Sequence, residues 1–297
     1  MTQQQTMQQL DIFADSRDVM LRNDVLEQLQ RRDAAEARQA WQKLADGFPD
    51  NEALAGLATL VEVLEGDGAT PFADHGALAA VCRHLDDPVE PAARRLLGET
   101  AGRAWMASCW RAVAQQAAAL PFRAEERDHH AAPVWLRAGD WKEATRAVGR
   151  IESWRRIPPP LAWMVEARYR AEGLESALPL LTELAWLSPG LLADLLHRIH
   201  DASVDGLRKK FDASFDGAGQ VSDLAWFPAW ALIEKPGLAL VLREAQPSRQ
   251  TAPERAVRLL LQILNLERQG SQHELVERRK ALRDLHAGLY AAYMKTR

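Results

Sequence analysis

The 297-residue sequence has few of the features that mark secreted, membrane-spanning or disulfide-linked proteins. Its two cysteines, Cys82 and Cys109, are too few for a disulfide framework, which favours a reducing compartment and two thiols in the core. No apolar run is long enough to span a bilayer. The N-terminal MTQQQTMQQ lacks the basic cluster and apolar stretch of a secretion signal, so we expect a cytoplasmic protein.

An excess of basic charge is also absent. Lys and Arg total 37 against 41 Asp and Glu, giving a formal net charge of -4, so we expect no direct binding of nucleic acid. Neither of the glycine-rich phosphate-binding patterns occurs, and the Cys and His residues lack the spacing of a zinc site. We therefore expect no metal, no cofactor and no catalytic residues that a local motif would reveal.

Helical periodicity is the main signal that the sequence does contain. Asp15 and Ser16 form a good N-cap pair, and apolar residues then recur every three or four positions up to Leu29. Further helical stretches follow, separated by short breaks at 31–33, 48–51 and at several later Pro or Gly positions. Sustained period-two alternation is lacking, so the sequence predicts an all-α protein.

The predicted organisation has four parts. We expect a flexible tail with a short motif at 1–14, a helical-repeat domain at 15–200, an Asp/Gly-rich loop or linker at 201–222, and C-terminal helices packed on the repeats at 223–297, the first of them from Asp223 to about Arg243. Within the linker, Asp201 and Asp212 each begin a D-x-S-x-D-G pattern that resembles the start of a calcium-binding EF-hand loop. Neither pattern has the glutamate that such a loop needs at its twelfth position, so we expect Asx turns and no calcium site.

Two segments share a pattern at a spacing of 34 residues. Trp135-x3-Gly139 and Tyr169-x3-Gly173 are each followed by a small alanine and by an apolar helix that ends at a proline. This pattern resembles the tetratricopeptide repeat, in which glycine occupies the turn within a pair of antiparallel helices. Residues 16–51 repeat it in part, with Asp33 at the turn. The resemblance implies a stack of helix pairs whose curved surface binds proteins or peptides.

That surface would include aromatic and basic side chains. If the repeats are real, Trp135, Trp141 and Trp163 lie near its inner face, although helical spacing makes tryptophan more often a core residue. Arg146 and Arg150 are four residues apart on one predicted helix, where they would hold an acidic peptide or form a solvated face.

A short motif precedes the first helix. Gln9-Leu10-Asp11-Ile12-Phe13 resembles the pentapeptide by which bacterial DNA polymerases and mismatch-repair proteins bind the sliding clamp, with Ile12 in place of leucine. In that motif the glutamine amide forms hydrogen bonds and the two apolar side chains fill adjoining pockets. The alternative is that Leu10, Ile12 and Phe13 pack on the first helices as a lid over the end of the stack.

The sequence therefore favours a non-enzymatic protein-interaction scaffold. A second hypothesis is an accessory protein of DNA replication or repair that Gln9–Phe13 recruits to the clamp. A third is an enzyme whose site is assembled from residues distant in the sequence, which would leave no local motif.

Overall fold

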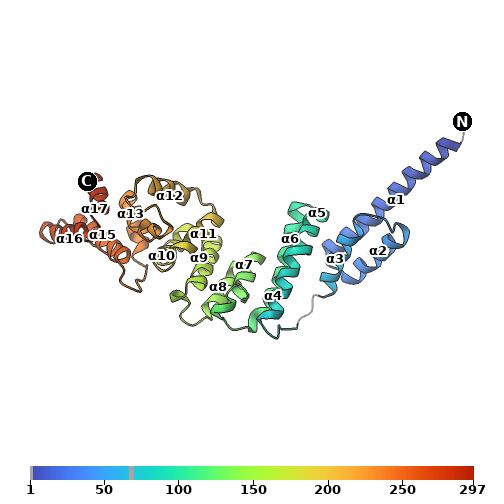
Figure 1. Cartoon of the computed structure of the whole chain (residues 1–297), viewed down its shortest axis with the longest axis horizontal. Helices are drawn as coiled ribbons and strands as arrows, with labels where there is room; N and C mark the ends of the chain where they lie inside the picture. The colour runs from blue at the N-terminus through green and yellow to red at the C-terminus, as the bar shows by residue number, and fades with distance from the viewer. Residues whose placement is uncertain (1–2, 67–69) are drawn as a thin grey trace. The chain divides into compact units, whose positions relative to one another are not determined.

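The computed structural model describes the backbone of residues 3–66 and 70–297, and the side chains of residues 17–66 and 70–297. The described residues form helices joined by turns and contain no strand, which confirms the all-α prediction (Figure 1). The chain divides into two compact units, Met1–Asp140 and Trp141–Arg297. This boundary lies well before residue 200, where the sequence suggested that the repeat domain ends. No helix in the described residues is both long and apolar enough to cross a membrane.

The first unit begins with a helix pair and a third helix that packs on it. These helices are α1 (Gln3–Arg31), α2 (Ala34–Gly47) and α3 (Leu54–Glu65). The Asp33 carboxylate accepts the Glu36 backbone N–H at 3.1 Å and so caps α2, at the position where the sequence predicts a turn. The fully buried Ala37 lets α1 and α2 approach closely, and the Trp41 indole donates to the Leu54 carbonyl at 3.1 Å.

Four more helices complete the first unit. They are α4 (His75–His84), α5 (Glu90–Leu97), α6 (Glu99–Gln116) and α7 (Ala131–Ala138). The expected break at Asp86–Pro88 is instead a π-helical turn, Leu85–Val89, which keeps the chain helical between α4 and α5. The wider turn accommodates Pro88, which has no N–H to donate. The helices α5 and α6 cross tightly, because a Cβ on Gly102 would lie 2.7 Å from the Ala93 carbonyl oxygen.

The second unit is built around helix pairs and several shorter helices. Its helices are α8 (Trp141–Gly149), α9 (Pro158–Glu172), α10 (Leu174–Leu187), α11 (Pro189–Ile199), α12 (Ala202–Ser214), α13 (Phe227–Glu234), α14 (Ala239–Leu242), α15 (Ala252–Gln269), α16 (Gln272–Leu285) and α17 (Ala287–Lys295). Consecutive helices α8 to α11 pack against one another, as do α15, α16 and α17 (Figure 1).

The two glycines of the predicted repeat both occupy turns. Gly139 ends α7 with a left-handed φ of 74°, and Gly173 separates α9 from α10 with a φ of 89°. The small residue Ala177 is fully buried on α10, in keeping with a close helix pair. The prolines, however, begin the next helices instead of ending the previous ones, because Pro158 and Pro189 stand in the first turns of α9 and α11.

Two predictions about the second half of the chain are wrong. The segment 201–222 is not a long loop, since most of it forms α12, with the Asp201 carboxylate accepting the backbone N–H groups of Ser203 and Val204. Val204 and Phe211, seven residues apart, are buried on one face of that helix. The helix expected from Asp223 to Arg243 is instead split into α13, α14 and two 3-10 turns, because Pro236 cannot continue α13.

Candidate functional site

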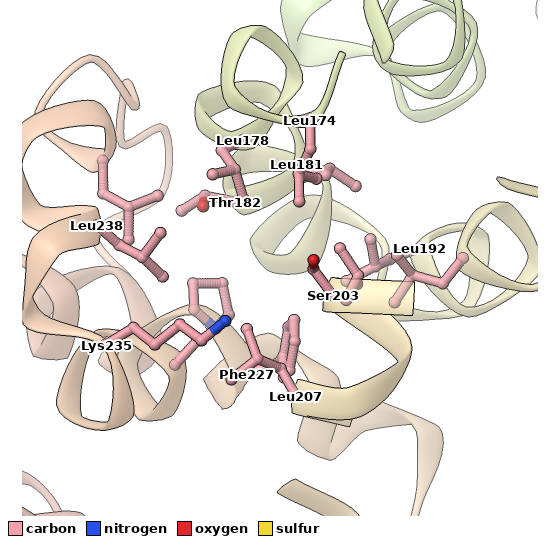
Figure 2. A pocket seen from close by; sticks show the side chains of 15 residues that line it. Leu174, Leu178, Leu181, Thr182, Leu192, Ser203, Leu207, Phe227, Lys235 and Leu238 are labelled. Atoms are coloured by element: carbon pink, nitrogen blue, oxygen red, sulfur yellow. The ribbon is translucent and has the colours of Figure 1, made fainter. Parts of the chain in front are cut away.

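An apolar pocket in the second unit is the best-formed candidate for a binding site. One wall comes from α10, where Leu174, Leu178 and Leu181 recur at helical spacing, and Leu192 and Leu196 of α11 adjoin it. Figure 2 shows the α10 side chains and Leu192 directed toward a common space. Leu174 and Leu178 are only half-buried, so this wall ends at the protein surface.

The opposite wall comes from residues further along the chain. Val204 of α12 and Ala231 of α13 line it. Leu207 of α12, Phe227 of α13 and Leu238 in the turn before α14 lie across from the leucines of α10 (Figure 2). The cavity volume is about 80 Å³. The segment around Phe227 is rich in aromatic side chains. Its neighbour Trp230 is buried against Phe211, so the segment both anchors α13 and lines the pocket.

Only three polar side chains line this pocket. Thr182 is buried on α10, whereas Ser203 and Lys235 are exposed and mark its rim. Lys235 follows the last residue of α13, and its side chain reaches along the pocket in Figure 2. The interior of the pocket is therefore hydrophobic apart from Thr182, and a cationic group lies at its mouth.

A buried ion pair fixes the backbone that supports the pocket. Glu183 is 4 % exposed and accepts two hydrogen bonds from the Arg155 guanidinium, one of them 2.6 Å long. The same carboxylate accepts the Gln246 backbone N–H at 2.7 Å. Because Glu183 adjoins the pocket residue Thr182, and Gln246 follows soon after the pocket residue Leu242, this pair ties α14 to α10. The charge-assisted hydrogen bonds thus fix the position of α14 relative to α10.

A second buried carboxylate orders the segment that follows α14. Glu254, in the first turn of α15, is 1 % exposed and accepts the backbone N–H groups of Arg249 and Gln250 and the Ser248 hydroxyl. This carboxylate satisfies donors of its own loop and helix start, as an N-terminal cap does. Its role is therefore structural.

The first unit has a different polar cluster. The His75 ring contacts the Pro121 carbonyl oxygen at 2.8 Å through Nε2 and the Glu126 carboxylate at 3.3 Å through Nδ1. His130 accepts the Ala132 backbone N–H at its Nδ1 and so caps α7. Burial, together with the nearby His75, lowers the pKa of His130 to about 4, which keeps its imidazole neutral at pH 7. None of these residues lines the apolar pocket of the second unit.

The residues proposed from the sequence as a curved binding surface differ in their exposure. Trp135 and Trp163 are 7 % and 8 % exposed, so they are core residues and offer a partner almost no surface. Trp141 is half-buried at the start of α8. Arg146 and Arg150 are exposed, and Arg146 pairs with Glu143 one turn earlier on the same helix, as a solvated face would.

The structure describes the backbone of the N-terminal motif but not its side chains. Helix α1 begins at Gln3, so the backbone of Gln9–Phe13 is helical in this structure, in contrast to the expected flexible tail. Glutamine, methionine and leucine are good helix formers, which accounts for the extension of α1 toward the N-terminus. The side chains of Gln9, Leu10, Ile12 and Phe13 lie outside the described residues, so the choice between an exposed motif and a packed lid stays open.

The two cysteines and the acidic side chains are the other candidates for nucleophiles and metal ligands. Cys109 is buried, and burial raises the pKa of the half-buried Cys82 to about 11, so the Cys82 thiol stays protonated at neutral pH. Where side chains are described, no group of three or more His, Cys, Asp or Glu residues is arranged to hold a metal ion. None of the family models, curated proteins or solved structures compared with this chain matches it.

Proposed function

We propose that this chain is a non-enzymatic protein-interaction scaffold built of antiparallel helix pairs, and that its second unit binds a partner through the pocket between α10 and α14. The observation that carries the proposal is the pocket itself, which combines a hydrophobic interior, an exposed rim and a rigid frame. Pockets of this composition are where proteins bury the apolar anchor of a ligand. The resemblance of the glycine turns to tetratricopeptide repeats supports a binding role for the helix pairs.

Photocrosslinking at the rim tests this function. A benzophenone amino acid replacing Ser203 stands at the mouth of the pocket, and the same amino acid replacing Ser214 is an exposed control at the other end of α12. We expect discrete protein adducts from position 203 in native cells, and loss of those adducts when Ala231→Leu fills the pocket. Equal adducts from both positions, or adducts that survive the filled pocket, would overturn the proposal.

A second candidate function rests on Gln9–Phe13. We propose as the alternative that this motif recruits the chain to the bacterial sliding clamp as an accessory of DNA replication or repair. Clamp binding uses the motif in an extended form, so the first turns of α1 would unwind on binding, at a cost in ordering free energy.

Titration of a purified bacterial clamp tests this alternative. The parent chain should bind, Leu10→Ala/Phe13→Ala should not, and Gln4→Ala/Gln5→Ala should bind like the parent because it leaves the motif intact. Absence of binding by the parent, or equal binding by all three proteins, removes the clamp hypothesis. A fall of several degrees in the Tm of the Leu10/Phe13 variant alone would favour the packed lid.

A further inference from the structure

The size of the pocket limits what it can hold. An engineered cavity of about 150 Å³ lined by Leu, Ile and Phe accommodates benzene. The pocket between α10 and α14 has a volume of about 80 Å³ and a similar lining, so it accepts a group of roughly half that size. A branched aliphatic side chain such as that of leucine, isoleucine or valine meets this limit, whereas a long acyl chain exceeds it.

The charges at the rim are distributed unevenly. Lys235 stands exposed at the mouth, and no salt bridge found among the described side chains involves it. On the α12 side, the rim residue Ser203 is uncharged. A ligand with an anionic group is thus attracted toward Lys235, which sets the direction in which it lies across the pocket.

We infer that this pocket receives a branched aliphatic side chain from a partner peptide in which an acidic residue adjoins that side chain, with its carboxylate paired to Lys235. The inference rests on the proposed protein-binding function and specifies the chemistry of the partner. Transfer of the aliphatic group from water into the pocket supplies affinity. Pairing of the carboxylate with Lys235 favours this peptide over other apolar peptides that lack an acidic residue. Peptides with a basic neighbour are disfavoured, because Lys235 repels them.

Small probes test this chemistry on the full chain. Isocaproate carries an isobutyl group and a carboxylate, isocaproamide is its neutral counterpart, and decanoate is a long-chain carboxylate. Leucine and valine methyl NMR should show isocaproate shifting the methyl signals of Leu178, Leu196 and Leu207. We expect isocaproamide to bind about threefold more weakly, because an exposed ion pair contributes little. Equal affinity of acid and amide would overturn the role of Lys235, and tighter binding of decanoate would make this a lipid site.

Variants of the chain test the contribution of Lys235 and that of the apolar interior separately. Lys235→Gln should lower isocaproate affinity about threefold, to the level of the amide, while Lys209→Gln, an exposed lysine outside the pocket, should leave it unchanged. Ala231→Leu should abolish binding. Leu238→Trp enlarges a half-buried side chain of the pocket wall, so it should also abolish binding even if the filled core of Ala231→Leu proves unstable. Undiminished binding by Leu238→Trp would place the probe elsewhere.

Blocked tetrapeptides connect the probes to a partner. Acetyl-Gly-Leu-Glu-Gly-amide should shift the same methyl signals more strongly than acetyl-Gly-Leu-Gln-Gly-amide. If neither probe nor peptide binds while the adducts at position 203 persist, the inferred chemistry is wrong and the scaffold function stands. If isocaproate binds but no adducts form at position 203, the pocket takes small acids and the scaffold function itself fails.

Discussion

The two units bury polar groups of opposite kinds. The first unit buries His75 and His130, whose partners are a carbonyl oxygen, a backbone N–H and the half-exposed carboxylate of Glu126. The second unit buries Glu183 and Glu254, each of which accepts several hydrogen bonds from guanidinium, hydroxyl or backbone donors. Fully satisfied carboxylates rigidify the chain around them, whereas a neutral imidazole is disturbed whenever a proton is added. The candidate pocket lies in the unit with the more firmly fixed frame.

The largest expected effect comes from removing a buried charge in the second unit. Glu183→Gln leaves the Arg155 guanidinium and the Gln246 N–H without their anionic partner, and should lower the free energy of unfolding by about 3 kcal/mol. Urea denaturation measures the loss, and hydrogen exchange should show it in α10 and residues 244–250. As a control, Glu143→Gln breaks only the exposed pair with Arg146 and should cost less than about 0.5 kcal/mol. Equal effects of the two changes would break the comparison.

Acid should have a comparable effect on the first unit. The pKa of His130 is lowered from 6.5 to about 4, so the neutral form stabilises the folded state above pH 6.5 and this contribution is lost as the pH falls to about 4. The loss amounts to about 3 kcal/mol. Hydrogen exchange of α7 between pH 7 and pH 4, corrected for the intrinsic exchange rate, measures it.

His130→Asn provides the matched control for the acid effect. Asparagine keeps an N-cap acceptor for the Ala132 N–H but does not titrate. Its stability in the first unit should depend less steeply on pH than that of the parent. His75 and Glu126 are present in both proteins, so the difference between the two isolates His130. Parallel pH profiles of the two proteins would show that protonation of His130 does not lower the stability of the first unit.

A smaller effect is expected from adding a methyl group at one helix glycine in each unit, which compares how tightly the helices pack there. Gly102→Ala places a Cβ 2.7 Å from the Ala93 carbonyl, so α5 and α6 must move apart, at a cost of about 2 kcal/mol. Gly190→Ala on α11 meets no atom within 4 Å and should stabilise the second unit by about 0.5 kcal/mol, because alanine favours a helix. Thermal denaturation of both variants measures the contrast. A neutral Gly102→Ala would mean that the helices cross less closely.

The smallest expected effect tests the helix found where the sequence predicted a linker. Asp201→Ala removes the cap of α12 and should cost about 1 kcal/mol, visible as faster hydrogen exchange in Ala202–Ser214. Asp212→Ala removes only the exposed pair with Arg208 on the same helix and should have little effect. If 201–222 behaved as a linker, neither change would alter its exchange.

Local signals were sufficient for much of the fold. Asp33, Gly139 and Gly173 marked turns correctly because capping and left-handed backbone depend on neighbouring residues alone. The same reasoning failed for 201–222, where aspartate and glycine content outweighed the spacing of Val204 and Phe211. The burial of that face depends on α13, whose Trp230 contacts Phe211, and such a long-range contact leaves no local trace.

The pocket was beyond prediction for a related reason. Each of its leucines has the spacing of a core residue, and only the packing of several helices decides which of them keep an unfilled space between them. Lys235 becomes a rim residue because α13 stops just before it, ahead of Pro236. The sequence suggested a helix through that proline, and so predicted neither the turn nor the cavity beside it.

Competition at the crosslinking site tests the central claim most directly. With the benzophenone at position 203, isocaproate should reduce the yield of protein adducts in proportion to its occupancy of the pocket, and isocaproamide should do so less at the same concentration. That result would join the apolar cavity, the charge of Lys235 and the capture of a partner in one measurement. Adduct yields that isocaproate leaves unchanged, while methyl NMR shows the pocket filled, would contradict the account.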